Sequence, residues 1–265
     1  MAKISPTIPF SNTLGDYSVY KMQGFEKLIV RRRHGPSKEQ LKKEKRYEKF
    51  RFWQNEFAGA SKGSQQIQRA ISSIKHLKDF SFGGLLTKIC KLMQKQETQY
   101  ALGTRPILFS QQGSILNGFN INKKNPFDVV VKSPVIHTFS RTDAKAIVVI
   151  PQLHPGINLA NPGQWPLFRF IIGLGGIQDM VHDGSGYTTS GAAKFLNSKQ
   201  VQTAWFSSDS VCKKMTCEIK LDDKAVLDEN TTVVLSIGIE FGRMISDGIV
   251  EGVKRGGCGK ILGMG

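Results

Sequence analysis

Cysteine is scarce in this sequence, and long apolar runs are missing. Cys90, Cys212, Cys217 and Cys258 are too few and too scattered for the disulfide framework of a small secreted domain. No apolar run approaches the ~18 residues that a membrane-spanning helix requires, and the first residues lack the apolar core of a signal peptide. We therefore expect a soluble, reduced, cytoplasmic protein without a membrane span, although secretion without an N-terminal signal stays open.

Familiar nucleotide-binding motifs are also missing. The segment Gly256–Lys260 resembles a phosphate-binding loop only superficially. Lys254 stands where such a loop needs its first glycine, and Ile261 stands where it needs Ser or Thr. Gly173–Gly176 misses the dinucleotide spacing, because its sixth position is Gln178. We expect neither segment to hold a cofactor, and we interpret the C-terminal one as a flexible or strand-pairing tail.

Catalytic and metal-binding constellations are equally hard to find. His182, Asp183 and Ser185 are close neighbours in the sequence, whereas catalytic triads assemble from distant segments. Cys212 and Cys217 have no companion pair of Cys or His at zinc spacing. We therefore expect a polar loop at 182–185, unligated thiols, no metal and no enzymatic activity.

Positive charge, in contrast, is abundant and unevenly distributed. The chain has 37 Lys and Arg against 21 Asp and Glu, a formal net charge of +16. Residues 1–126 hold 23 of these cations against 8 acidic residues, whereas residues 127–265 hold 14 against 13. This asymmetry favours a polyanionic partner, or an acidic neighbour in an assembly, for the first half only.

The first hundred residues predict a hairpin followed by helices. After a polar arm over 1–16, the β-prone runs Tyr17–Lys21 and Lys27–Arg31 flank a turn at Gln23-Gly24. Ser37 and Gln40 then form a capping-box pattern that opens a helix to about Phe57. We expect the glycines of 59–63 to break that helix, Ser64 to cap a second helix, and a third helix to follow Gly83-Gly84.

Apolar residues spaced by three and four define the buried face of these later helices. In the second helix they are Ile67, Ala70, Ile71, Ile74 and Leu77. In the third they are Leu85, Leu86, Ile89, Leu92 and Met93.

The pattern changes to short β-prone segments after a glycine- and asparagine-rich connection. The expected strands are 128–131, 135–139, 144–150, 167–172, 201–206, 216–221 and 231–241. Short strands separated by turns indicate an antiparallel sandwich or barrel. We predict an α+β protein with an N-terminal β-hairpin plus cationic helices (1–104), a connecting segment (105–126) and a C-terminal antiparallel β-sandwich (127–265).

One stretch combines cations with aromatic residues. The eleven candidate polyanion-binding residues are Lys27, Arg31, Arg32, Arg33, Lys38, Lys42, Lys43, Lys45, Arg46, Lys49 and Arg51. Aromatic side chains at 47, 50, 52, 53 and 57 could stack on bases while the cations neutralise phosphates. The alternative is a solvated helix face, partly compensated by Glu39, Glu44 and Glu48, whose aromatics pack on the sandwich.

Short motifs spread along the chain resemble an uncharacterised family of cytoplasmic-looking proteins from Bacteroidota. They are Leu28–Lys38, Phe50-Arg51, Asn55-Glu56-Phe57, Ile150–Pro155 and Gly238–Phe241. The resemblance implies neither an activity nor a site, because the family has no assigned function. The dense lysine content after the Ser-Lys helix start departs from the family pattern.

The leading hypothesis is a non-enzymatic structural or assembly protein, a homo-oligomer whose cationic helical module meets an acidic partner surface. The alternative is a sequence-nonspecific nucleic-acid-binding protein that uses residues 27–51 directly. An enzyme whose site forms only in the fold is the third possibility.

Overall fold

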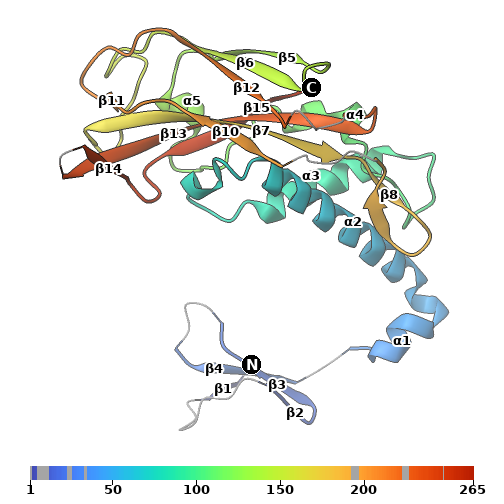
Figure 1. Ribbon diagram of the computed structural model, residues 1–265. Helices are drawn as coiled ribbons and strands as arrows, with labels where there is room; N and C mark the ends of the chain where they lie inside the picture. Colours follow the sequence, from blue (N-terminus) through green and yellow to red (C-terminus); the bar gives the residue numbers. More distant parts are fainter. Residues whose placement is uncertain are drawn as a thin grey trace. The chain divides into compact units, whose positions relative to one another are not determined.

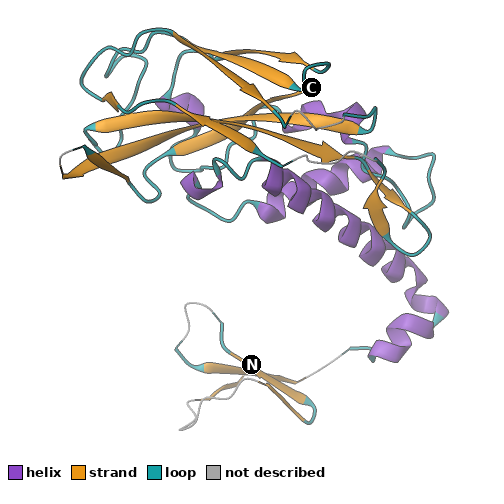
Figure 2. Cartoon of the chain, viewed as in Figure 1, coloured by secondary structure: helices purple, strands orange, loops and turns teal. Residues whose placement is uncertain are grey.

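The computed structural model describes residues 2–4, 12–22, 26–32, 35–191, 197–222, 227–246 and 248–265. Helices and antiparallel strands are both present, which confirms the predicted α+β class (Figure 2). The chain divides into two compact units, Met1–Arg51 and Phe52–Gly265. No helix in the described ranges is long and apolar enough to cross a membrane.

The first unit contains a four-stranded antiparallel sheet. Its order is β1 (Ala2–Ile4), β4 (Leu28–Arg32), β3 (Tyr17–Tyr20) and β2 (Asn12–Leu14). The predicted hairpin is confirmed as β3 and β4, with Tyr17 opposite Arg32 and Tyr20 opposite Ile29. The expected turn at 23–24 lies outside the described residues. The arm expected over 1–16 is a wrong prediction in part, because β1 and β2 extend the hairpin on both sides.

The predicted capping box opens helix α1 (Lys38–Lys43). The Gln40 amide donates to Ser37 Oγ at 3.1 Å, and the Ser37 amide donates to Gln40 Oε1 at 2.7 Å. The single helix expected from Lys38 to Phe57 is wrong, since Glu44 has an extended ψ of 135° that ends α1. A 3-10 turn, η1 (Lys45–Tyr47), then leads into α2 (Glu48–Ala70).

Helix α2 runs straight through the glycines that were expected to break it. A Cβ at Gly59 would lie 2.6 Å from the Tyr187 ring, and one at Gly63 would lie 3.2 Å from Cys90 Sγ. These glycines therefore serve close packing inside the helix. Ser64 is not a helix cap, because it lies within α2 and its Oγ donates to the Gly83 carbonyl at 3.1 Å.

The larger unit contains a sandwich of two antiparallel sheets, one above the other in Figure 1, and a separate two-stranded sheet of β8 (Met180–His182) and β9 (Tyr187–Thr189). The smaller sheet comprises β5 (Ile136–Ser140), β6 (Lys145–Ile150) and β12 (Met215–Lys220). The larger sheet is built on β10 (Lys199–Gln202), β7 (Leu167–Gln178), β13 (Thr231–Ser246) and β14 (Ile249–Gly252), with β11 (Phe206–Ser207) on β7 and β15 (Cys258–Met264) on β13.

The segment that precedes the small sheet, residues 109–130, contains only short helices and loops. The strand expected at Asp128–Val131 is wrong, because Phe127–Val130 forms the helix α5. The short helices α4 (Phe109–Gln112) and η3 (Gly113–Leu116) occupy the connection upstream of it.

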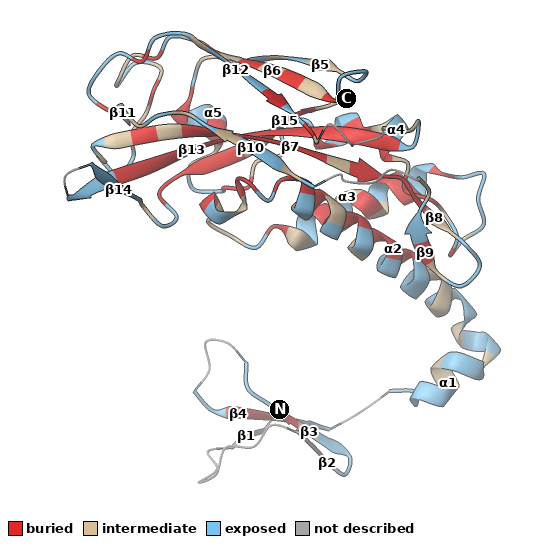
Figure 3. Ribbon diagram, viewed as in Figure 1, coloured by how far each residue is buried: buried red, intermediate tan, exposed pale blue. Residues whose placement is uncertain are grey.

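Strand β7 and the first twelve residues of β13, Thr231–Gly242, are largely buried on both faces (Figure 3). On one face Phe170 and Leu235 share a hydrophobic cluster with Val148 of the small sheet. On the other face Ile171 and Val234 pack with the helices. All five predicted apolar residues of the second helix lie in this second cluster, at 1% exposure or less.

Helix α3 (Gly83–Gln96) also covers the large sheet beside α2. Leu86 and Met93 are buried as predicted, but Leu85 and Leu92 are each 42% exposed, so the predicted face of this helix is partly wrong. Because residues 60–93 share one core with the sheet, the helices belong to the sandwich unit. The division at Arg51 therefore differs from the expected boundaries at 104 and 127.

Glycines line the side of the large sheet that faces the helices. A Cβ at Gly175 would lie 2.6 Å from the Ala70 carbonyl oxygen, and one at Gly238 would lie 2.5 Å from Leu77 Cδ1. A Cβ at Gly173 would overlap Ser73 Oγ. The absence of side chains at these glycines thus allows the helix layer to lie close to the backbone of the sheet.

Candidate functional site

Ten of the eleven predicted polyanion-binding residues lie in the described part of the chain, and Arg33 lies outside it. Arg31 and Arg32 lie on β4, and Lys27 directly precedes that strand. The other seven lie on α1, η1 and the first turn of α2: Lys38, Lys42, Lys43, Lys45, Arg46, Lys49 and Arg51.

Nine of these ten side chains are exposed, and α1 has no buried residue at all. The pairing with acidic neighbours is sparse. Among the residues that the structure describes, the cations of the module form one ion pair, Arg46 Nε with Glu44 Oε2 at 2.5 Å. The Arg46 guanidinium also lies over the Tyr47 ring, 4.9 Å from its centroid.

Arg51 is the exception, because it has a structural role. Its Nη1 donates to the carbonyl of Leu41 at 2.9 Å and to that of Glu44 at 3.0 Å. These are carbonyls at the end of α1, which lack partners within the helix. Arg51 therefore fixes the junction between α1 and α2. Of the other nine described cations, Arg46 is paired with Glu44, and the remaining eight are exposed to a ligand.

The aromatic residues of the same stretch fall into both units. In the first unit Phe50 is 44% exposed. In the second unit Trp53 is 57% and Phe57 is 59% exposed. Three of the five aromatic residues of this stretch are thus exposed.

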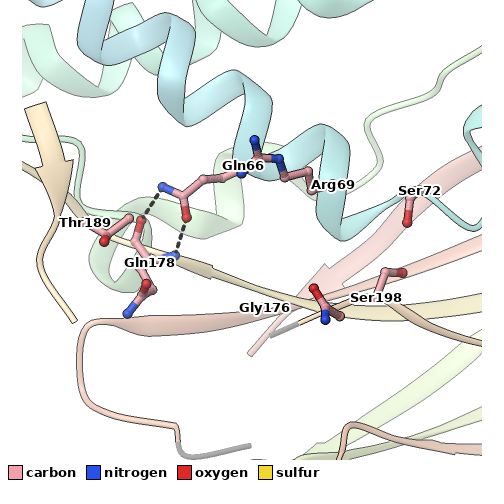
Figure 4. A pocket seen from close by; sticks show the side chains of 8 residues that line it. Gln66, Arg69, Ser72, Gly176, Gln178, Thr189 and Ser198 are labelled. Carbon is pink, nitrogen blue, oxygen red and sulfur yellow. Dashed lines mark hydrogen bonds between the residues drawn. The ribbon is translucent and has the colours of Figure 1, made fainter. Parts of the chain in front are cut away.

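A polar cavity of about 490 Å³ lies beside α2 in the second unit (Figure 4). Its lining is rich in amides and hydroxyls: Gln66, Arg69, Ser72, Gly176, Gln178, Thr189, Asn197 and Ser198. Gln66 binds the main chain of Gln178 at both groups: its Nε2 donates to the carbonyl at 3.2 Å, and its Oε1 accepts from the amide at 3.0 Å. Such a lining can hydrogen-bond a polar ligand, and Arg69 adds one cation.

Sequence reasoning missed this cavity. Gln66 and Arg69 lie on the polar side of a helix for which only the apolar positions carried a prediction. Nothing in their spacing signals that β7 and the segment at 197–198 approach them.

The segment at 182–185 forms the loop between β8 (Met180–His182) and β9 (Tyr187–Thr189). Asp183 Oδ1 accepts hydrogen bonds from the Ser185 amide and Ser185 Oγ, both at 2.8 Å, and from the Gly186 amide at 2.9 Å. These hydrogen bonds hold the pKa of the Asp183 carboxyl below its usual range. The serine hydroxyl is thus engaged in a local turn.

The cysteines lie apart from any ligand cluster in the described ranges. All four thiols are free, with Cys90, Cys212 and Cys258 buried. Burial raises the pKa of the Cys90 thiol to about 12, which keeps it protonated and unreactive at neutral pH. No group of three or more His, Cys, Asp or Glu side chains that could hold a metal ion occurs among the described residues.

The glycine-rich segment at 256–260 enters strand β15, which pairs with β13. A Cβ at Gly259 would lie 3.0 Å from the Ile237 carbonyl oxygen, so the glycine admits a close neighbour strand. This placement agrees with a strand-pairing tail.

Comparison with known proteins adds no evidence about these surfaces. The resemblance to a Bacteroidota family therefore stays a prediction from short motifs. No family model, no curated protein and no solved structure matches this chain.

Proposed function

We propose that the protein is a non-enzymatic structural or assembly protein whose cationic module, residues 27–51, binds an acidic partner surface. The observation that carries this proposal is the exposure of nine cations on a segment with one internal ion pair in its described part. Residues 1–51 hold 13 Lys and Arg against 5 Asp and Glu, a balance of +8. Four free thiols favour a reducing, cytoplasmic compartment.

A surface of this kind attracts polyanions through its positive electrostatic potential. Exposed lysines that form no internal contacts keep their charge available to a partner, and complementary charge raises the rate of association. The attraction is screened by salt, so it should weaken steeply as ionic strength rises.

Self-association is the second part of the proposal. Strands β10 and β14 end the path of the large sheet, and an unpaired strand edge is a template for another chain. Met244, Ile245 and Ile249, on the hairpin of β13 and β14, are 59–62% exposed. Light scattering at increasing protein concentration should therefore show oligomers, and a protein that stays monomeric at high micromolar concentration would contradict this part.

The decisive experiment is a salt series with poly-glutamate as the acidic probe. Replacing Arg31, Arg32, Arg33, Lys42, Lys43 and Lys45 with Gln should reduce binding and flatten its salt dependence. The matched control replaces six exposed lysines of the second unit, Lys88, Lys124, Lys132, Lys213, Lys214 and Lys254, and changes the net charge equally. If both variants lose binding to the same extent, net charge and not the module is responsible.

The nucleic-acid alternative is favoured by one observation. Phe50 is exposed beside Lys49, where an aromatic ring could stack on an unpaired base. Single-stranded oligonucleotide should then bind more tightly than poly-glutamate, and the Phe50→Ala variant should lose that preference. Equal affinity for both polymers would rule this alternative out.

A further inference from the structure

A second hollow, of about 650 Å³, lies in the larger unit between α2, α3 and the loop at 102–105. It shares no residue with the cationic module or with the polar cavity of Figure 4. Its volume falls in the range of small-molecule sites, which are mostly apolar with a few placed polar groups.

The apolar side of this hollow is provided by aromatic residues. Trp53 and Phe57 are four residues apart on α2, so they project from the same face of the helix. They are 57% and 59% exposed, and Leu102 adjoins them in the lining. When an apolar group covers large aromatic side chains that are this exposed, apolar surface is removed from water and the free energy falls.

The opposite side is cationic. Lys91 and Lys95 are one turn apart on α3, and Arg105 follows on the loop. Glu56, 1% exposed, is the one carboxylate in the lining. It accepts from Lys91 Nζ at 2.7 Å and from the Gly103 amide at 3.0 Å. Three cations against one carboxylate leave two positive charges uncompensated.

Arg105 is held in place but only partly satisfied. Its carbonyl accepts from Tyr187 Oη at 2.8 Å and from Gln94 Nε2 at 3.3 Å, which anchors the backbone at this point. Its Nε lies 3.6 Å from Glu56 Oε1, too far for a hydrogen bond. This buried Nε has no hydrogen-bond acceptor among the described residues. The Arg105 side chain as a whole is 23% exposed, so an oxyanion in the hollow can reach its charge and form a charge-assisted hydrogen bond.

We infer that this hollow binds an amphipathic anion, a carboxylate on an aliphatic chain. The carboxylate binds between Arg105 and Lys95, while the chain covers Trp53, Phe57 and Leu102. The charge balance excludes a cationic head, and the exposed aromatics disfavour a fully polar ligand.

Calorimetric titration with decanoate, kept below its micelle concentration, tests the site on the full chain. We expect saturable binding that weakens about tenfold or more with decan-1-ol, because a charged hydrogen bond is lost. Lys95→Gln and Trp53→Ala should each weaken decanoate binding several-fold, whereas Lys88→Gln, on α3 outside the lining, should not. Lys95 and Trp53 are exposed, so circular dichroism should show that these variants fold normally.

Three outcomes would overturn the inference. One is equal affinity for decanoate and decan-1-ol, which would mean apolar adsorption without recognition of the head. Another is unchanged decanoate affinity in both Lys95→Gln and Trp53→Ala. The last is binding to phosphatidylglycerol vesicles with no binding of free decanoate, which would make the hollow a membrane contact.

Discussion

At the scale of the residue, small differences in space and charge decide how this molecule packs. Gly175 and Gly238 let the helix layer approach the sheet closely. A side chain at Gly175 would meet the backbone of Ala70, and one at Gly238 would meet the side chain of Leu77. Glu240, 7% exposed, places a carboxylate next to Arg169 and His76 at the same sheet. For both kinds of position, a single substitution can test the contribution to stability.

Gly175→Ala should destabilise the protein by about 2 kcal/mol, because the new methyl group would overpack Ala70. Urea unfolding followed by circular dichroism measures this. The control is Gly186→Ala, since a Cβ at Gly186 meets nothing within 4 Å. Equal stability of the two variants would show that the helix layer can move away from the sheet to make room for the methyl group.

Glu240→Gln should lower the free energy of unfolding at pH 7 by about 2 kcal/mol, because it leaves the Arg169 charge without its partner. Arg169 Nε and Nη2 each lie 2.7 Å from Glu240 Oε2. The control is Glu218→Gln, whose more exposed ion pair with Lys145 should contribute less than about 1 kcal/mol.

The same glutamate predicts a pH dependence. Burial acts to raise the pKa of Glu240, but hydrogen bonds from His76 and Arg169, together with their charges, outweigh it and hold the pKa below 4.5. A depressed carboxyl pKa stabilises the fold above its unfolded-state value, and this contribution is lost as pH falls through the folded-state pKa. Urea unfolding between pH 7 and pH 3 should show a smaller loss in Glu240→Gln than in the native chain. Parallel curves would contradict the assignment.

At the scale of the element, features encoded by near neighbours could be predicted and features encoded by distant ones could not. The capping box of α1 depends on residues 37–40 alone, and the sequence indicated it correctly. The glycines of α2 were misread as a helix break, because their role depends on Tyr187 and Cys90. The polar cavity and the second hollow were missed for the same reason, since each is lined by segments far apart in the chain.

Ser37→Ala should destabilise α1 by about 1 kcal/mol, because the Gln40 amide loses its acceptor. Helix α1 has no buried residue, so its local opening should be independent of global unfolding. Amide hydrogen exchange should therefore accelerate in 38–43 while the unfolding midpoint stays unchanged. A lowered midpoint would show that α1 is coupled to the core.

At the scale of the whole molecule, charge and core are separated. Both hydrophobic clusters draw their residues from Ala60 onwards, whereas the exposed cationic module ends before Phe52. The charge asymmetry was visible in the sequence. The packing of residues 60–93 against the large sheet was not, because hydrophobic spacing cannot show which surface a helix covers.

Residues 52–265 alone should therefore fold and lose poly-glutamate binding. Their thermal midpoint should shift by less than about 4 °C, the change that 1 kcal/mol produces in a domain of this size. Differential scanning calorimetry of the truncated and full chains measures it. A truncated chain that lacks a cooperative transition would show that the first 51 residues complete the fold.

The glycine-lined face of the sheet has a mechanical consequence. Side chains that project from a sheet resist the sliding of a helix over it. Glycines reduce the number of such side chains on this face, where Ile171, Ile177 and Val234 also contact the helix layer. The lengthwise position of α2 is then registered by Gln66, whose amide is bonded to both main-chain groups of Gln178. These two hydrogen bonds hold α2 at one position along β7.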